Sequence, residues 1–237
     1  MTSDALFRGA VKVSQPRDGH RATIDTLLLA AFAAVGRRPS AVVDLGAGSG
    51  ALSLSLRHLG LGERFLCVEL RREAAVLCGE NLTRAGAQAE VWCHDLQAGL
   101  PPACERQADL VAFNPPYFPP GTGRGTPPST RGRVGDLAPF LEAARHALGP
   151  RGRVCLCYPA AQLELALAAG KRVQLALKRL RFVHAYAGKP ARLCLLEFKP
   201  GRPGGVRVEP PLVEWIAHGA PSEELARIMN GRGVGPE

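Results

Sequence analysis

Residues 41–50 read Ala-Val-Val-Asp-Leu-Gly-Ala-Gly-Ser-Gly, an apolar run that leads into three glycines within five positions. The run is short and apolar, so it predicts a buried strand, and a helix-like segment follows the glycines. Glycine permits a sharp turn and a close approach of the backbone to a ligand. In doubly wound folds such a turn lies at the carboxyl edge of the sheet, where ligands bind. The stretch therefore predicts an α/β fold with a ligand site at its glycine loop.

The rest of the chain continues this alternation of strands and helices. Further strands are expected at 65–69, 89–94, 109–113, 154–158, 180–186 and 192–199, and helices at 50–59, 71–85, 137–148 and 222–229. Alternation implies right-handed βαβ units and a mainly parallel sheet. The last two strands flank a Gly-Lys-Pro turn, which favours an antiparallel pair at the sheet edge. We expect a Rossmann-like, seven-stranded, mainly parallel sheet with an antiparallel edge strand, and a long loop over 118–135.

Charge is distributed unevenly along the 237 residues, whose formal net charge is +9. Residues 1–117 hold 12 basic and 12 acidic residues, whereas residues 118–237 hold 18 basic and 9 acidic ones. A one-sided basic half is a candidate surface for nucleic acid. Codon bias explains an arginine-rich composition equally well, so composition leaves both interpretations open.

The cysteines and the apolar segments bear on the compartment. The 7 cysteines form no CxxC pair, and four of them lie in strand-like runs, which argues against a disulfide scaffold or a zinc site. The amino terminus has no apolar signal-peptide core, and the longest apolar stretch, 27–35, is too short to cross a bilayer. We expect a cytoplasmic protein with neither a metal nor a membrane anchor.

Three acidic residues follow the pattern of the predicted strands. Glu69 ends the second strand, where a carboxylate can accept both hydroxyls of a ribose. Asp44 precedes the glycine loop, where it repels a pyrophosphate but suits a ligand that carries an ammonium and a sulfonium. Asp95 ends the third strand and can accept from an adenine amino group. Each acid alone is equally consistent with a helix or turn cap. Together with the glycine loop they resemble the S-adenosylmethionine site of class I methyltransferases.

The fourth strand ends in Asn114-Pro-Pro-Tyr117. Two prolines hold the backbone extended and withhold two N–H donors, so carbonyl oxygens face the pocket. The Asn114 side-chain oxygen and the Pro115 carbonyl can then accept both hydrogens of a planar amino group, with Pro116 stiffening the turn and Tyr117 stacking on the substrate. Residues 111–117 resemble the signature of methyltransferases that act on adenine N6, cytosine N4, guanine N2 or glutamine amides.

Residues 19–29, Gly-His-Arg-Ala-Thr-Ile-Asp-Thr-Leu-Leu-Leu, resemble the leader of the bacterial adenine-N6 methyltransferases that act on valine tRNA. In that family the stretch wraps the methionine end of the cofactor. The resemblance therefore implies that Asp25 lies near the cofactor amino group or caps its own helix. The resemblance implies methylation of the adenine beside the anticodon, with S-adenosyl-L-methionine as cofactor. The implied cofactor residues are Asp25, Asp44, Gly46, Ala47, Gly48, Gly50, Glu69, Leu70, Asp95, Leu96 and Asn114.

Basic residues follow the Asn-Pro-Pro-Tyr motif in two runs, 124–133 and 171–192, and neither run contains an acid. If they face the same side as Tyr117, they form a phosphate-binding rim for RNA, most simply tRNA; a solvated helix face is the alternative for any single one. The expected set is Arg124, Arg131, Arg133, Lys171, Arg172, Lys178, Arg179 and Arg181.

The chain divides into a leader (1–40), a methyltransferase core (41–200) and a carboxyl-terminal extension (201–237). Other functions remain open on the residues alone: an rRNA guanine-N2 or protein glutamine methyltransferase of the same fold, or an RNA-binding module with a vestigial cofactor site. A nicotinamide dehydrogenase is a distant fourth, since its cofactor needs no Asn-Pro-Pro-Tyr.

Overall fold

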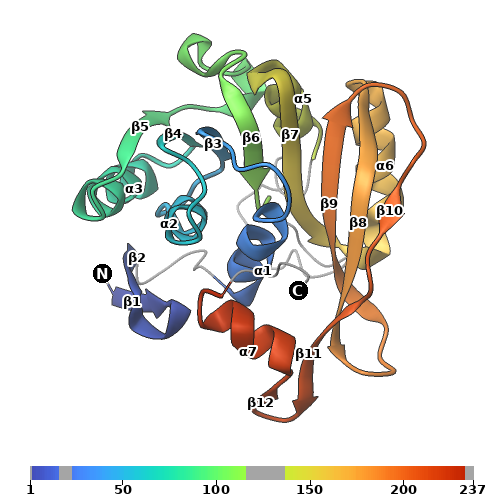
Figure 1. Cartoon of the computed structure of the whole chain (residues 1–237). Helices are drawn as coiled ribbons and strands as arrows, with labels where there is room; N and C mark the ends of the chain where they lie inside the picture. Colours follow the sequence, from blue (N-terminus) through green and yellow to red (C-terminus); the bar gives the residue numbers. More distant parts are fainter. Residues whose placement is uncertain (1, 16–22, 116–136, 233–237) are drawn as a thin grey trace, which may run out of the picture.

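The computed structural model describes residues 2–15, 23–115 and 137–232 and is built on one sheet of ten strands (Figure 1). The strands lie in the order β12-β11-β8-β9-β7-β6-β3-β4-β5, and β10 pairs with β8. Their bounds are β3 Ala41–Leu45, β4 Arg64–Glu69, β5 Gln88–Cys93, β6 Ala108–Phe113, β7 Leu148–Pro159, β8 Leu175–Tyr186, β9 Ala191–Pro200, β10 Arg207–Val208, β11 Leu212–Ala217 and β12 Ala220–Pro221.

The predicted α/β fold with a mainly parallel sheet is confirmed, and β3 to β9 are its seven expected strands. The antiparallel strand is β9, which pairs with β7 on one side and β8 on the other. The sequence suggested an antiparallel strand at the edge of the sheet. Among the seven expected strands, β9 lies one place inside that edge, which β8 occupies. Beyond it, β10 and β11 pair in parallel with β8 and cover what would otherwise be the open edge of the sheet.

Helices cover both faces of this sheet, as a parallel sheet with hydrophobic faces requires. Helices α1, α2, α3 and α7 pack on one face, and α5 and α6 pack on the other. The pleat of β3 shows the alternation: Val42 belongs to the first core, whereas Val43 and Leu45 belong to the second. Their bounds are α1 Ile24–Ala33, α2 Ala51–His58, α3 Arg72–Arg84, α5 Ala138–Ala147, α6 Leu163–Arg172 and α7 Glu223–Met229.

The leader contains a hairpin that the sequence analysis did not anticipate. Strands β1 (Thr2–Leu6) and β2 (Val11–Gln15) pair antiparallel outside the main sheet, joined by the short helix η1 (Phe7–Gly9). The buried Asn81 of α3 ties this hairpin to the glycine loop: its Nδ2 donates to the Ser14 carbonyl at 2.9 Å and to the Ser49 carbonyl at 2.8 Å. The leader is thus connected to the loop where the ligand site is expected.

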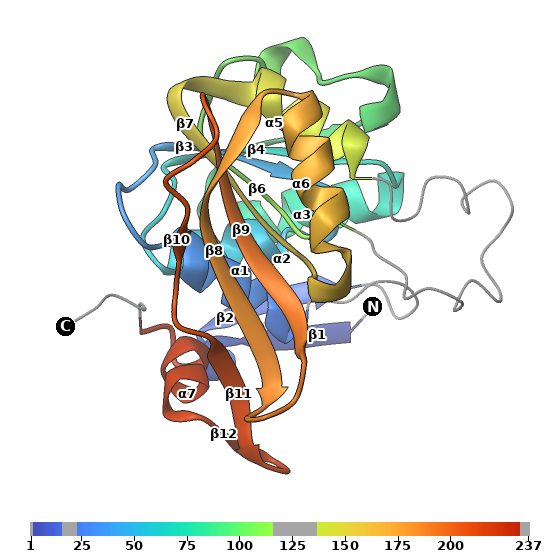
Figure 2. The ribbon, with the colours of Figure 1, turned by 90° about the vertical axis from the view of Figure 1, so that its right-hand side faces the viewer.

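The carboxyl-terminal extension joins the same sheet rather than forming a separate unit. Figure 2 shows β10 and β11 running along β8, with α7 at the end of the sheet that also holds the hairpin. The expected helix near 222–229 is present as α7, and Ser222 caps it by accepting from the N–H of Leu225 at 3.1 Å. Helix α6 and strands β10 to β12 were not predicted from the sequence.

All 7 cysteines are free thiols, and six of them are buried. Within the described ranges no cluster of His, Cys, Asp and Glu is arranged to hold a metal ion. No helix in the part of the chain that the structure covers has the length and apolar character to span a bilayer. The long loop expected at 118–135 lies outside the described residues.

Candidate active site

The glycine loop lies between β3 and α2 at the carboxyl edge of the sheet. The N–H groups of Gly46 and Ala47 both donate to the Val68 carbonyl, at 2.8 and 3.1 Å, which folds the loop back against β4. Gly46, Gly48 and Gly50 have φ angles of +70°, +56° and +83°, a backbone region that side chains disfavour. A Cβ at Gly48 would meet nothing within 4 Å, so the backbone there is open to a ligand.

Glu69 fixes this loop from the end of β4. Its Oε2 accepts from the N–H of Gly48 at 2.9 Å, and its Oε1 accepts from the N–H of Arg71 at 2.9 Å. The side chain is buried, yet the next residue, Leu70, leaves 49% of its surface exposed. This arrangement suits a nucleoside. The Glu69 carboxylate can accept hydrogen bonds from ribose hydroxyls, and the exposed Leu70 side chain can pack against a base.

Asp44 is 1% exposed inside β3 and is bonded to the first turn of α2. Its Oδ2 accepts from the Ser53 N–H at 3.2 Å and from the Ser53 hydroxyl at 2.7 Å. Burial raises the pKa of Asp44 from 3.8 to about 7; the Ser53 hydrogen bonds oppose this rise, and the negative charge of Glu69 adds to it. The carboxyl group therefore caps a helix, as the alternative interpretation held, and is poised to ionise when a cation approaches.

Asp95 also has a capping role, because its Oδ1 accepts from the Gln97 N–H at 3.0 Å at the start of η2 (Leu96–Ala98). Asp95 and Leu96 are both half-buried, two and three residues beyond the end of β5. The structure thus brings Asp44, Glu69 and Asp95 to the carboxyl ends of three neighbouring strands, as the sequence predicted.

Asn114 follows β6 directly, on the strand next to β3. Its Oδ1 accepts a hydrogen bond from the Cys157 thiol at 3.0 Å, because the preceding residues, Phe113 of β6 and Leu156 of β7, are paired across the two strands. Desolvation raises the pKa of the Cys157 thiol well above its usual range, so the thiol stays protonated and remains a donor. Pro115 is buried next to Asn114. Pro116 and Tyr117 lie outside the described residues, as do residues 19–22 of the leader motif.

Asp25 lies in the first turn of α1 and is buried. Its Oδ1 accepts from Arg192 Nη2 at 2.6 Å. Arg192, from β9, also donates to Glu214 of β11 through Nε at 2.6 Å and Nη2 at 2.5 Å. Burial alone would lower the Arg192 pKa, but the hydrogen bonds to Glu214 and Asp25 raise it. Neither Arg192 nor Glu214 was expected at the site.

A family assignment follows from the comparison of the sequence with known families. Residues 22–162 match the family described as the methyltransferase small domain, more than half of the chain. The chain belongs to this family. Its cofactor is therefore S-adenosyl-L-methionine, and the fold predicted from the glycine loop is that of class I methyltransferases.

Relatives within this group bear on the reaction. The chain is 30% identical to a tRNA1(Val) (adenine(37)-N6)-methyltransferase of Shewanella halifaxensis, over 65% of this chain and 63% of the relative, so it spans slightly less than two thirds of that protein. A relative of the same name from Erwinia tasmaniensis is 30% identical over 81% of this chain and 80% of its own length. A crystal structure of a predicted O-methyltransferase from Agrobacterium tumefaciens shares the fold, with a TM-score of 0.65 and 20% identity over 88% of this chain and 97% of that one.

The residues at the carboxyl edge fit the cofactor of this methyltransferase family. The open backbone at Gly48 leaves space that a Cβ would enter, and Glu69 and Leu70 offer a carboxylate and an apolar surface next to it. Asp44, buried beside the loop, would offer an acidic group to the cationic end. We expect these residues, with Gly46, Ala47, Gly50, Asp95 and Leu96, to hold the cofactor.

The basic residues expected to bind RNA are distributed differently from the prediction. Arg179 is buried at 6% exposure, and its guanidinium lies 3.8 Å above the Phe32 ring. Its Nη2 donates to the Phe32 carbonyl at 2.6 Å and pairs with Glu197 at 3.1 Å. The assignment of Arg179 to an RNA-binding surface is therefore wrong: tertiary partners on α1 and β9 compensate its charge in the core.

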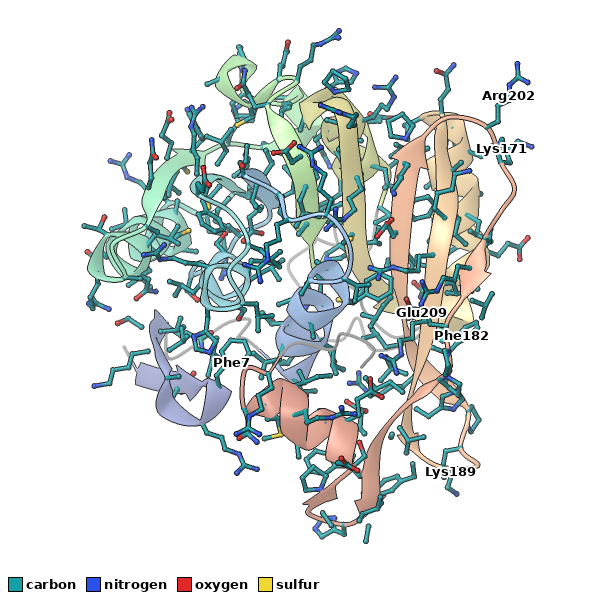
Figure 3. All side chains as sticks on the ribbon, in the orientation of Figure 1. Phe7, Lys171, Phe182, Lys189, Arg202 and Glu209 are labelled. Carbon is teal, nitrogen blue, oxygen red and sulfur yellow. The ribbon has the colours of Figure 1, made fainter. Side chains whose placement is uncertain are left out.

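Other members of the basic set lie far from Asn114. Lys171 and Arg172 end α6 just before β8, at the amino edge of the parallel strands, opposite the edge that carries Asn114. In Figure 3 Lys171 lies at one end of the sheet, near Arg202, and Lys189 lies at the other. Lys178 bonds two backbone carbonyls near that same amino edge. These three do not share an edge with Asn114, contrary to the single rim that the sequence suggested.

The Arg181 guanidinium forms an ion pair with Glu224 of α7, with 2.7 Å between Nη1 and Oε1. Arg124, Arg131 and Arg133 lie outside the described residues. Sequence reasoning missed Ser53, Asn81, Cys157, Arg192 and Glu214. Asn81 left a signal, because it is a polar residue on the same helix face as Leu77, Cys78 and Leu82; the others are defined only by contacts between distant segments.

Proposed function

We propose that this methyltransferase methylates an exocyclic amino group, most specifically N6 of an adenine in tRNA. The observation that carries the proposal is the position of Asn114: it follows β6 directly, beside β3, which contains Asp44 and leads into the glycine loop. An amide oxygen at that place accepts from an amino group and suits an amine acceptor better than a hydroxyl. The Shewanella and Erwinia relatives, both named as tRNA1(Val) (adenine(37)-N6)-methyltransferases, support adenine and tRNA.

Asn114 and Pro115 would orient the acceptor. The Asn114 Oδ1 and the Pro115 carbonyl accept the two hydrogens of the amino group, so that the nitrogen lone pair turns out of the plane of the base. When bound, S-adenosyl-L-methionine supplies an electrophilic methyl group. The protein's contribution is then positioning and electrostatic stabilisation, without a strongly basic side chain. Pro116 and Tyr117 complete the motif in this proposal, with Tyr117 stacking on the base.

On the cofactor side, the Glu69 carboxylate would accept hydrogen bonds from the ribose hydroxyls, and the Asp95 carboxylate would accept one from the adenine amino group. Asp44 and Asp25 would face the cationic methionine end. The capping contacts that Asp44 and Asp95 make with Ser53 and Gln97 occupy part of their acceptor capacity, because each carboxylate has about four lone-pair sites.

Contact with RNA in this proposal depends on Arg124, Arg131 and Arg133, which follow the motif in sequence. Lys171, Arg172 and Lys178 would reach RNA only through a part of the substrate remote from the reacting base. Binding that rests on phosphate contacts weakens steeply with salt, because counterions are released. A complex insensitive to salt would contradict RNA binding by these residues.

The alternatives differ in the acceptor. An rRNA guanine-N2 enzyme and a protein glutamine methyltransferase would use the same Asn114 geometry. An RNA-binding module with a vestigial cofactor site is disfavoured by the intact contacts of Asp44 and Glu69 with Ser53 and the glycine loop.

The test is incubation of the purified protein with labelled S-adenosyl-L-methionine and separate tRNA, rRNA and release-factor fractions, followed by nucleoside analysis. We expect label in N6-methyladenosine from tRNA. Asn114→Ala should lose at least about 100-fold in kcat, as for a lost transition-state donor or acceptor, while Asn230→Ala, on α7's carboxyl end, serves as the matched control. Label in guanosine or only in protein would replace the proposed acceptor.

A further inference from the structure

Three carboxylates of the carboxyl-terminal extension are paired with arginines of the sheet, and one of them, Glu209, pairs with the buried Arg179 of β8 at 3.5 Å. Glu214 of β11 pairs with Arg192 of β9, and Glu224 of α7 pairs with Arg181 of β8. All three pairs attach the extension to the core. They differ in what lies on the far side of the arginine, since only Arg192 continues to Asp25 of the leader.

The geometry at Arg192 is tightly specified. Glu214 receives two parallel hydrogen bonds, from Nε at 2.6 Å and from Nη2 at 2.5 Å, and Nη2 also reaches Asp25 at 2.6 Å. A bidentate pair fixes the plane of the guanidinium as well as its position. The Glu214 side chain is 2% exposed and the Asp25 side chain 9%, whereas Arg192 remains 33% exposed. The three groups therefore form a partly covered cluster with a formal charge of −1.

This cluster borders the place where Asn114 lies. Leu193, the residue after Arg192, pairs with Pro159 of β7, two positions from Cys157. Desolvation is the main cause of the raised pKa of the Cys157 thiol; the negative charge of Asp25 adds to it and Arg192 opposes it. Cys157 in turn donates to Asn114 at 3.0 Å. Segments from the leader, the core and the extension thus meet at the carboxyl edge of the sheet.

We infer that the carboxyl-terminal extension is a working part of the cofactor site: Glu214 and Arg192 are positioning residues that hold the Asp25 carboxylate for the ammonium end of S-adenosyl-L-methionine. The inference rests on the cofactor contact of Asp25 in the proposed function. Arg192 holds the Asp25 carboxylate in one orientation. Glu214 compensates Arg192, so the cluster keeps a net negative charge for the cationic ligand. Without Glu214, Arg192 would neutralise Asp25 completely.

Glu214→Gln tests this with little change of shape, and Glu224→Gln is the matched control because it removes another ion pair between the extension and the sheet, one that does not reach Asp25. Calorimetric titration measures the Kd of S-adenosyl-L-methionine and of S-adenosylhomocysteine, which keeps the amino group but lacks the sulfonium charge. We expect Glu214→Gln to weaken both ligands about tenfold, the size of one lost charge interaction at short range, while kcat at saturating cofactor stays within about twofold. Glu224→Gln should leave both Kd values unchanged.

Arg192→Lys provides a second variant should Glu214→Gln fold poorly: it keeps the charge, loses the bidentate pair and should weaken both ligands in the same direction. The inference is overturned if folded Glu214→Gln binds both ligands as the wild type does, or if Glu224→Gln is weakened equally. Failure of the proposed substrate is distinguishable, because wild-type protein would then bind the cofactor normally and leave tRNA unmethylated.

Discussion

The thiol of Cys157 donates to the amide oxygen of Asn114 across 3.0 Å, from the strand next to the one that carries the asparagine. This hydrogen bond occupies one lone pair of Oδ1 and leaves the second for an amino group. The hydrogen bond also fixes which way the Asn114 carboxamide is rotated. Because the thiol is a donor, the amide oxygen faces Cys157 and the amide nitrogen faces away from it. A buried cysteine, which the sequence presents as a small core residue, therefore orients the amide that the proposed function uses to recognise an amine.

Two replacements of Cys157 distinguish the contribution of its hydrogen bond to Asn114 from that of its side-chain volume. Cys157→Ser keeps an O–H donor and should retain most of the wild-type kcat. Cys157→Ala removes one hydrogen bond of about 1 kcal/mol and should lower kcat about five- to tenfold, with the Kd of S-adenosyl-L-methionine unchanged. Single-turnover rates with tRNA measure the effect. Equal rates for the alanine variant and the wild type would remove Cys157 from the mechanism.

The raised pKa of Asp44 predicts a pH dependence of cofactor binding. In the free protein this carboxyl titrates at about 7, and the ionised form is the one that attracts a cation. Affinity for S-adenosyl-L-methionine should therefore rise with pH and level off above about 8; with half-ionisation near 7, binding at pH 6 should be about tenfold weaker than at pH 8. Asp44→Asn should bind weakly at both values. Comparing the two proteins removes the contribution of the ligand's own amino group.

The same group affects the stability of the free protein. An acid whose pKa is raised on folding stabilises the folded state fully below its unfolded pKa of 3.8, and this contribution is lost as pH rises through about 7. Asp44→Asn should therefore flatten the fall in Tm between pH 4 and 7. A wild-type and a variant profile of identical slope would show that Asp44 is not buried as described.

Glu69 should be sensitive to a one-atom change. Glu69→Gln replaces one acceptor oxygen by a donor, so the N–H of Gly48 or of Arg71 loses its partner in addition to a ribose hydroxyl. We expect S-adenosyl-L-methionine to bind about 10- to 100-fold more weakly, for one or two lost hydrogen bonds to a charged group. Glu63→Gln, exposed at the opposite edge of the sheet, is the control. Calorimetry on both variants gives the comparison.

Arg179 should matter for stability rather than for RNA. Arg179→Met leaves Glu197 buried with weaker partners and removes a donor to the Phe32 carbonyl, which should cost about 3 kcal/mol, or about 6–12 °C in Tm for a chain of this size. Lys171→Met, at an exposed site, should shift Tm by less than about 1 °C. Thermal unfolding of the two variants decides the point, and similar Tm values for both would contradict the buried role.

Local sequence was sufficient for the part of the fold that carries the cofactor. Apolar runs such as 41–45 and 109–113 have no competing interpretation, and glycines at 46, 48 and 50 mark a turn that needs positive φ at each. Right-handed connections then bring the strand ends together. Asp44, Glu69 and Asn114 were found for this reason: each follows a strand or lies near its carboxyl end.

The remaining parts depend on contacts that no local pattern reveals. Arg179 and Glu214 resemble surface charges in sequence, yet both are buried because partners from other segments compensate them. Strand β11 is recognisable only through its pairing with β8. The basic run at 171–192 spans both edges of the sheet and includes Arg179 in its core, so its charges do not form one surface.

Helix α1 is bonded near its carboxyl end by Arg153 and Arg179, which follow Ala33 and Phe32 by 120 and 147 positions, and at its first turn by Arg192, which follows Asp25 by 167. During synthesis the helix leaves the ribosome long before any of these arginines exists. The segment that comes early in the chain must therefore wait for the last strands before it is fixed, and closing such long loops slows folding. A truncated nascent chain would leave exposed the apolar surface of α1 that β7 and α7 cover in the complete fold, so burial of this early helix depends on residues near the carboxyl-terminal end of the sequence.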